Sequence, residues 1–234
     1  DNVKPRKRGR PRGTTPQADA TRERLYATAL RLIGRRGYDQ TTLRDIAKEA
    51  EVSVGLLYRY FPSKQAVVLA LYGELSSEFA SRGAGMPPGR WRDRFVFALE
   101  TSLEVLGPHR VALRSLVPVL VGDPDEGVFG HATAFSRVAV QDVFVLAVAG
   151  ASDAPRAHLA PALGRLLYLV HLAVLLWWLL DRSANQRATR ALVSLARQVL
   201  PSASLALRMP PMRKFVLSLD ELMRAALLAD TASA

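Results

Sequence analysis

Cysteine is absent from the 234-residue sequence. Its absence excludes disulfides, thiolate metal sites, iron–sulfur clusters and a cysteine nucleophile, and it fits a reducing compartment. The four histidines do not have the spacing of metal ligands. We therefore expect neither a metal nor a cofactor.

Long hydrophobic runs are also missing. The longest run, Leu166–Leu180, has 15 residues and is interrupted by His171, whereas a membrane-spanning helix needs roughly 20 apolar residues. The basic N-terminus is not followed by the apolar segment of a secretory signal. The sequence thus predicts a cytoplasmic protein with no membrane partner, in which Leu166–Leu180 is a helix buried in the core or at a subunit interface.

Acidic residues are outnumbered, with 21 Asp and Glu against 32 Lys and Arg and a net charge of +11. Residues 1–64 hold 15 of the basic and 7 of the acidic residues, a net charge of +8, which leaves +3 for residues 65–234. A basic module on a nearly neutral one is the charge pattern of a protein that binds nucleic acid. An anionic membrane surface is the alternative polyanion.

Hydrophobic residues recur at helical spacing over most of the chain, so the predicted fold class is all-α. Residues 1–18 are the exception, because Pro, Gly, Arg and Lys predict a flexible basic arm there. Residues 137–149 contain valines that favour a strand, but no other segment predicts a partner strand, so we assign a helix. The expected helices span about 19–36, 43–50, 54–60, 64–81, 90–106, 109–122, 126–149, 156–182, 186–200 and 211–229. We expect a kink at Pro118 and a loop from Pro201 to Pro210.

Several helix ends carry specific signals. Gly37 follows two arginines, a combination that ends a helix. Thr42 and Asp45 have the spacing of a capping box, and Ser53 and Ser63 are good N-caps. These signals predict two short helices, 43–50 and 54–60, joined by a tight turn.

This helix pair has the composition of a helix-turn-helix. Such a motif needs a small residue where its helices touch, an apolar residue that closes the turn and an apolar residue beneath the second helix. Ala47, Val52 and Leu57 occupy these places.

Residues 37–72 (GYDQTTLRDIAKEAEVSVGLLYRYFPSKQAVVLALY) resemble the N-terminal domain of the TetR family of bacterial transcriptional regulators. The resemblance covers about residues 19–81. Glu51 departs from the family, which usually has Gly in this turn, and Glu fits there as long as its φ stays negative. The matched positions are Gly37-Tyr38, Thr41-Thr42, Ile46-Ala47, Val52-Ser53, Gly55, Leu57-Tyr58, Phe61 and Lys64.

The resemblance implies a ligand-responsive regulator, a repressor in most members, that binds a palindromic operator in double-stranded DNA as a homodimer. Each subunit would insert its third helix into the major groove, and a small-molecule effector would change the helix separation and release the DNA. The implied organisation is a basic arm (1–18), a helix-turn-helix domain (19–64), a connecting helix (65–81) and a C-terminal domain for ligand binding and dimerisation (82–234).

The DNA contacts implied by the resemblance fall on the second and third helices. Tyr58 and Lys64 match positions that contact phosphates, and Arg44 matches a position that reads bases in some members. Packing or a solvated surface position is the alternative for each. The full set of candidates in this domain is Thr42, Arg44, Val54, Gly55, Leu56, Tyr58, Tyr60 and Lys64.

The arm adds Arg8, Arg10 and Arg12 to the candidates. Its Arg-Gly-Arg-Pro core resembles an AT-hook, which would lie in the narrow minor groove of A·T-rich DNA. A polybasic arm that contacts phosphates without shape preference is the equal alternative.

Aromatic residues and His171 mark a candidate ligand pocket in the C-terminal domain. Tyr168, His171, Leu175 and Trp178 share one helix face, and a neighbouring face with Trp177 suits a dimer seam. Ordinary core packing is the alternative for every one of these residues. The pocket candidates are Trp91, Phe95, Phe129, Phe135, Tyr168, His171 and Trp178.

The sequence also bears on competing functions. There is no Gly-rich phosphate loop, nucleophile elbow or paired-carboxylate pattern, so we do not expect an enzyme, although a helical enzyme is the contrasting class. A transcriptional activator and a ligand-independent regulator remain open. The apolar C-terminal domain favours an apolar or amphipathic effector.

Overall fold

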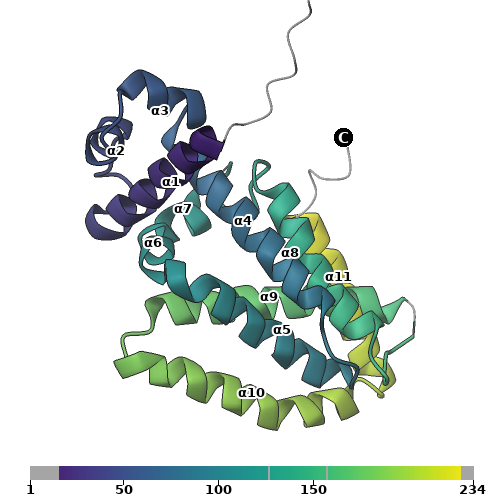
Figure 1. The fold of residues 1–234 in the computed structure, drawn as a ribbon. Coiled ribbons are helices and arrows are strands. Elements are labelled where there is room, and N and C mark those ends of the chain that lie inside the picture. Colours follow the sequence, from purple (N-terminus) through teal and green to yellow (C-terminus); the bar gives the residue numbers. More distant parts are fainter. Residues whose placement is uncertain (1–15, 126, 157, 228–234) are drawn as a thin grey trace, which may run out of the picture.

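The computed structural model describes residues 16–125, 127–156 and 158–227, and these residues contain helices and no strand, which confirms the all-α prediction. Figure 1 shows a small bundle of α1 to α3 that α4 connects to a larger helical bundle. The helices are α1 (Pro16–Arg36), α2 (Leu43–Glu49), α3 (Val54–Tyr60), α4 (Lys64–Ala84), α5 (Trp91–Leu106), α6 (Arg110–Ser115), α7 (Val117–Gly122), α8 (Ala134–Ala149), α9 (Leu159–Leu180), α10 (Arg187–Ala206) and α11 (Pro210–Leu227).

The predicted caps form in the small bundle. The Asp45 backbone N–H donates to Thr42 Oγ1 at 3.1 Å, and the Thr42 N–H donates back to the Asp45 carboxylate at 3.0 Å. Ser53 and Ser63 accept from backbone N–H groups three residues later, at 3.1 and 3.0 Å. Gly37 ends α1 with a φ of 90°, and local sequence therefore fixes where α2, α3 and α4 begin.

One apolar core holds these helices at their crossing angles. Leu25 and Ile33 of α1, Ile46 of α2 and Leu57 of α3 are almost fully buried in it. Phe61, directly after α3, stacks on Tyr26 with ring centroids 6.4 Å apart. Burial of these side chains leaves the opposite face of α3 exposed.

The boundaries of three predicted elements differ from the structure. Helix α1 begins at Pro16, inside the segment predicted as the arm, because Pro is favourable in the first helical turn. The predicted helix 126–149 starts only at Ala134, and turns occupy 127–133. These turns bring Gly130 so close to the preceding chain that a Cβ there would lie 2.1 Å from the Asp125 carbonyl oxygen.

Two prolines act differently from the prediction. The predicted helix 109–122 consists of α6 and α7, which break at Leu116, and Pro118 sits in the first turn of α7 rather than at a kink. Helix α10 continues through Pro201 to Ala206, where we expected a loop from Pro201 to Pro210. Leu200 and Leu207 pack against the core on either side of Pro201, and this packing outweighs the lost backbone hydrogen bond.

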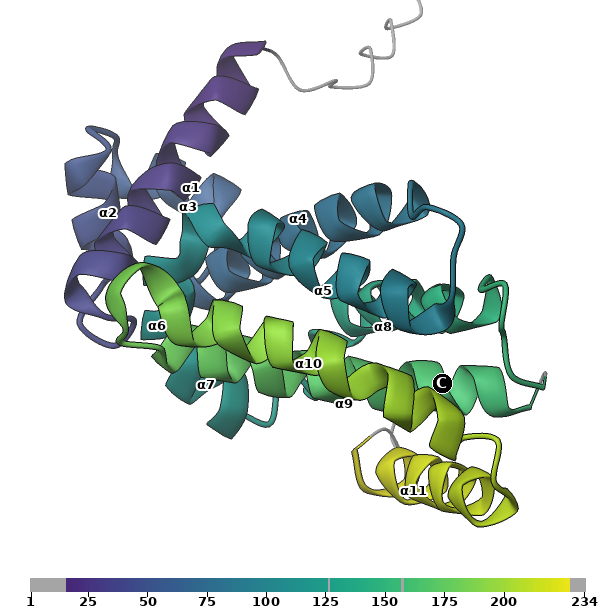
Figure 2. The same cartoon turned by 90° about the horizontal axis from the view of Figure 1, so that it is seen from below.

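The larger bundle is built around α9. Helix α8 packs along it so closely that a Cβ on Gly164 would lie 2.5 Å from Val145 Cα. Helix α11 packs on α9 as well (Figure 2). Arg165 of α9 and Asp220 of α11 form a bidentate ion pair with both N–O distances at 2.6 Å. By length and composition α9 could span a membrane, but half of its most apolar window is buried in the bundle.

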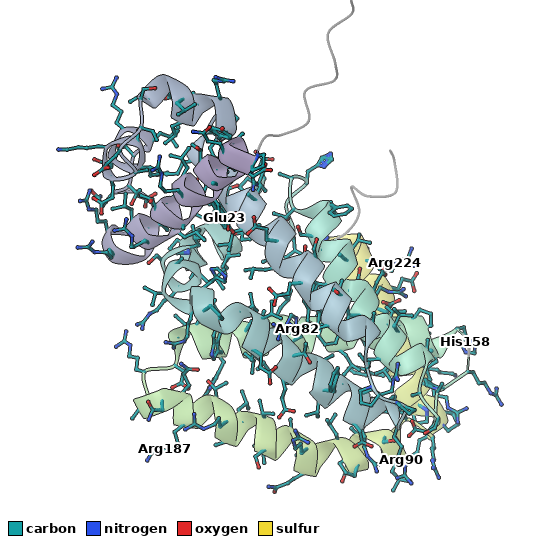
Figure 3. The ribbon with its side chains drawn as sticks, viewed as in Figure 1. Glu23, Arg82, Arg90, His158, Arg187 and Arg224 are labelled. Carbon is teal, nitrogen blue, oxygen red and sulfur yellow. The ribbon has the colours of Figure 1, made fainter. Side chains whose placement is uncertain are left out.

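Helix α10 covers the side of the bundle formed by α5. The two helices run antiparallel, so that Arg187 at the start of α10 and Arg90 before α5 lie at opposite ends (Figure 3). Arg197 of α10 donates to both carboxylate oxygens of Glu100 on α5 at 2.6 Å. This ion pair holds α10 against α5.

The turn of the helix-turn-helix contradicts the expected backbone at Glu51. Its φ is 54°, in the left-handed region, whereas we expected a negative value. Val52 forces this conformation, because its N–H donates to the Ala47 carbonyl at 3.0 Å and closes the turn. A residue with a Cβ is strained there by roughly 1–2 kcal/mol.

We predict that Glu51→Gly raises the free energy of unfolding by about 0.5–1 kcal/mol, because glycine relieves the left-handed strain at some entropic cost in the unfolded chain. Urea denaturation followed by circular dichroism measures the change. Glu51→Ala is the matched control, since it removes the same carboxylate but keeps the Cβ. Equal stabilisation by Ala and Gly would show that the carboxylate, and not the backbone, is responsible.

Candidate functional site

Helix α3 presents one face to solvent. Val54, Gly55, Tyr58 and Arg59 are exposed, and the Tyr58 side chain is 51% exposed. Val54 and Gly55 lie one helical turn before Tyr58 and Arg59, so the four residues share one face of α3. The buried Leu57 holds the opposite face, so the orientation of the exposed face is fixed by the core.

Exposed cations lie on α3 and on α2, the helix that packs against it. Arg44 and Lys48 are exposed one turn apart on α2, and Arg59 lies at the end of α3. Thr42 is exposed beside them, with its hydroxyl engaged in the capping box. Arg59 and Lys48 were not among the sequence candidates, although the position of Arg59 four residues after Gly55 places it on the same face.

Lys64 has an additional role inside the protein. Its Nζ donates to the Tyr38 carbonyl oxygen at 2.5 Å and lies 4.0 Å from the centre of the Tyr38 ring. The ammonium group therefore joins the start of α4 to the turn before α2 and keeps further N–H donors for another acceptor. Leu56 and Tyr60 are half-buried at the edge of the exposed face. The arm candidates Arg8, Arg10 and Arg12 lie outside the described residues.

A separate apolar cavity of about 360 Å³ lies in the larger bundle. Helix α4 contributes Leu75 and Phe79 to its wall, and α9 contributes a row of side chains one turn apart. Its volume is in the range of small-molecule sites. The α9 residues of the wall include Tyr168, His171, Leu172, Leu175, Leu176, Trp178 and Leu179.

Four of the seven pocket candidates line this cavity, namely Phe129, Tyr168, His171 and Trp178. The other three do not. Trp91 and Phe95 are buried at the start of α5, where Asp153 accepts from the Trp91 N–H at 2.8 Å and Phe95 packs against Phe144. Phe135 is 79% exposed, because α8 begins at Ala134 and its rotation turns this side chain to solvent.

His171 is the most buried polar residue of the cavity wall. Its Nε2 lies 2.8 Å from Ser102 Oγ, and its ring stacks on Phe79 at a centroid distance of 6.1 Å. Its Nδ1 has no hydrogen-bond partner within the part of the chain that the structure describes. Burial lowers the pKa of His171 from 6.5 to about 3, so the imidazole is neutral near pH 7.

Arg137 is a cavity residue that the sequence reading missed. It lies in the first turn of α8, is only 5% exposed, and lines the cavity with Thr133 and Ser136. Arginine is usually found at the surface, so residue type alone does not indicate that Arg137 is buried. The turns at 127–133, which set where α8 begins, would have had to be known as well.

The larger bundle also exposes apolar side chains. On α9, Val170, Trp177 and Leu180 are about half exposed, and on α10 the same holds for Leu195 and Val199. Val170 and Trp177 lie two turns apart on α9, Leu180 follows one turn after Trp177, and Leu195 and Val199 lie one turn apart on α10. The two helices are neighbours (Figure 2). We call these two sets of residues the α9–α10 apolar face.

Two connections join the small bundle to the cavity. Helix α4 follows directly after α3 and lines the cavity at Tyr72, Leu75 and Phe79. Helix α1 packs against α6, where a Cβ on Gly34 would lie 3.1 Å from Val111 Cγ1. Helix α6 lines the cavity at Leu113, so both helices that contact the small bundle also border the cavity.

The known proteins to which this chain is similar are bacterial transcriptional regulators. Residues 25–71 match the family model of bacterial regulatory proteins of the tetR family. The HTH-type transcriptional repressor KstR of Rhodococcus jostii is 39% identical over 69 residues, which are 30% of this chain and 32% of that protein. The HTH-type transcriptional regulator EthR of Mycolicibacterium smegmatis is 31% identical over 126 residues, which are 50% of this chain and 55% of EthR. The chain thus spans about a third to a half of the length of these relatives.

Solved structures share the fold over most of the chain. A tetR-family regulator from Streptomyces coelicolor has a TM-score of 0.59 at 21% identity and covers 89% of this chain and 98% of its own. The fatty acid degradation regulator FadR from Bacillus halodurans has a TM-score of 0.58 at 18% identity, with coverages of 81% and 96%.

The buried His171 predicts a pH dependence of stability. Its folded pKa of about 3 lies below the ordinary value of 6.5, so the unfolded state binds more protons between these values and stability falls as the pH decreases. From pH 7 to pH 5 this group should cost about 2 kcal/mol of unfolding free energy. Urea denaturation of the protein and of His171→Gln at both pH values isolates the effect. The same pH dependence in both proteins would refute it.

Proposed function

Because the chain carries the DNA-binding domain of the tetR family of bacterial regulatory proteins, we propose that it regulates transcription as a dimer that binds a palindromic operator and releases it when a small molecule occupies the cavity. The observation that carries the proposal is the exposed face of α3 beside the cations of α2. The protein would act in the cytoplasm, where bacterial DNA lies.

The α3 face supports major-groove binding. Val54 and Gly55 open the helix, so apolar contact with thymine methyl groups and close approach of the backbone are available to it. Tyr58 and Arg59 point out one turn later as donors to phosphates, and Arg44 supplies a guanidinium to a base or a phosphate. Residues 8–12 of the arm would add contacts in the minor groove or to phosphates.

The α9–α10 apolar face supports a homodimer. Exposure of Trp177 and of the half-exposed valines and leucines around it to water is unfavourable. A two-fold symmetric interface would bury this apolar face on both subunits. A two-fold dimer axis also produces two α3 helices that match a palindrome.

Repression with release by an effector follows from the two connections to the cavity. A molecule between α4, α8 and α9 would displace α4 and the α6 segment against α1, and the distance between the two α3 helices would change. A repressor is the form that we propose, since the relative KstR is named as one. An activator would use the same α3 face, α9–α10 apolar face and cavity.

The arrangement nearest to a catalytic one is the pair of Ser102 and His171 in the cavity. A nucleophile and base need a third group that orients the base. In the described residues His171 Nδ1 has no such partner, and this supports a binding role and not catalysis.

Selection from a random duplex library tests the proposed function. The full chain is incubated with the library, the bound DNA is sequenced, and a palindromic consensus with half-sites about one helical turn apart is expected. Failure to enrich any sequence over repeated rounds, with folded protein, would reject sequence-specific DNA binding.

We predict that Tyr58→Phe weakens binding to the selected operator and to a scrambled duplex alike, by about tenfold, because a hydroxyl donor to a charged phosphate is lost. The slope of log affinity against log salt should not change, since no charge is removed. Arg59→Ala should instead lower that slope by about one unit. Fluorescence anisotropy at several salt concentrations distinguishes the two. An altered base preference for Tyr58→Phe would contradict the phosphate role.

We also predict that light scattering gives twice the chain mass, and that Trp177→Glu gives a monomer, because the carboxylate would be buried in the seam. Phe135→Glu is the matched control, since Phe135 is even more exposed but lies outside the α9–α10 apolar face. A monomeric wild type would reject the proposed dimer, and loss of the dimer only in Phe135→Glu would place the interface elsewhere.

A further inference from the structure

The described wall of the cavity contains one formal charge among mostly apolar side chains. Of the described residues that line it, Arg137 is the only Asp, Glu, Lys or Arg, and His171 is neutral at physiological pH. Arg137 is 95% buried by its accessible surface. A buried charge is unfavourable unless an opposite charge or a full set of hydrogen bonds compensates it.

The compensation of Arg137 is incomplete. Its Nη1 donates to the carbonyl oxygens of Gly130 and Val128 at 3.0 and 3.5 Å. Among the described residues, no carboxylate forms an ion pair with it, and Nε and Nη2 have no acceptor. Two carbonyl dipoles on one nitrogen leave most of the guanidinium charge uncompensated, and the three N–H groups of Nε and Nη2 remain available.

Other partly buried arginines of the bundle are compensated more fully. Arg165 on α9 meets Asp220 of α11 in a bidentate pair at 2.6 Å, and the Asp220 side chain is 8% exposed. Arg94 and Arg110 lack a carboxylate partner among the described residues, but each donates to three carbonyl oxygens from at least two nitrogens. Arg137 is more buried than these three arginines and donates to only two carbonyl oxygens within the part of the chain that the structure describes.

The surroundings of Arg137 add to its positive potential. Arg137 lies in the first turn of the 16-residue α8, where backbone N–H groups lack helical partners and the helix dipole is positive. Thr133 and Ser136 of the same turn belong to the cavity wall. Burial raises the pKa of Tyr168, and Arg137 opposes that shift, so the phenol is within electrostatic reach of the guanidinium.

The rest of the cavity suits a hydrocarbon. Phe79 of α4, Leu113 of α6 and Leu175 and Trp178 of α9 form apolar walls. A volume of about 360 Å³ holds about twelve non-hydrogen atoms at roughly 30 Å³ each, the share of a water molecule in the liquid. This is the size of a carboxylate on a chain of about ten carbons.

We infer that the effector is an amphiphilic monocarboxylate whose carboxylate pairs with the Arg137 guanidinium and whose apolar body of about ten carbons fills the cavity. The inference rests on the proposed function, because it takes the cavity as the effector site. A carboxylate matches the planar donor pair of a guanidinium and supplies the missing negative charge. A neutral or cationic amphiphile of the same length leaves Arg137 uncompensated.

The test compares ligands that share a chain and differ in charge. Calorimetric titration of the full protein with decanoate, 1-decanol and decyltrimethylammonium should show decanoate binding at least tenfold more tightly than 1-decanol, and the cation most weakly. Arg137→Met should remove the preference for decanoate over 1-decanol, and Arg137→Lys should keep part of it. Arg114→Met, an exposed arginine on α6, is the matched control and should bind like the wild type.

Equal affinity of the wild type for decanoate and 1-decanol would overturn the inference, and so would a preference that survives in folded Arg137→Met. Circular dichroism establishes that each variant is folded. If Arg137→Met fails to fold, a retained preference in Arg137→Lys supports the inference and its complete loss there contradicts it.

Operator release is measured separately, by anisotropy of labelled operator during the decanoate titration. Arg137-dependent binding without release would support the ligand class and reject the effector role in the proposed function. Intact operator binding without any decanoate binding would reject the ligand class and leave the DNA-binding function standing.

Discussion

The close packing of α8 on α9 is the contact on which the rest of the C-terminal domain depends. Gly164 allows it, because any side chain there would collide with the backbone at Val145. The contact fixes the rotation of α9 about its own axis. As a result His171 and Trp178 face the cavity, while Trp177, next to Trp178 in sequence, faces solvent. One apolar helix thus supplies both the cavity wall and the exposed stripe.

Helix α4 gives this interior a mechanical path to the small bundle. Its first residue, Lys64, is tied to the Tyr38 carbonyl, and its middle turns line the cavity at Leu75 and Phe79. The contact between α1 and α6 gives a second path. Under the proposed function, an occupant of the cavity would act on the small bundle through these two contacts.

The positively charged side chains discussed above lie in three different environments. The cations around α3 are exposed, where water screens them until a polyanion replaces it. Arg165 is partly buried and compensated by Asp220, which docks α11. Arg137 is buried and only partly compensated, and this difference is what assigns a ligand chemistry to the cavity.

The sequence by itself determined the elements whose signals are local. The capping box at Thr42, the serine caps of α3 and α4 and the spacing of Ala47 and Leu57 act between residues within about one turn or a few residues of each other, so they could be read in order along the chain. The helical assignment of residues 137–149 also held.

Only the tertiary structure decided which side chains meet. It placed Phe135 in solvent and Arg137, two residues later, in the cavity, because the turns before Ala134 set the start and rotation of α8. It gave Glu51 a positive φ, since closure of the turn by Val52 outweighed the strain. The conformation of Glu51 depends on a hydrogen bond within the turn itself, which composition does not indicate. The burial of a side chain depends on contacts with other segments, and periodicity records which faces of a helix are apolar but not which partner covers each face.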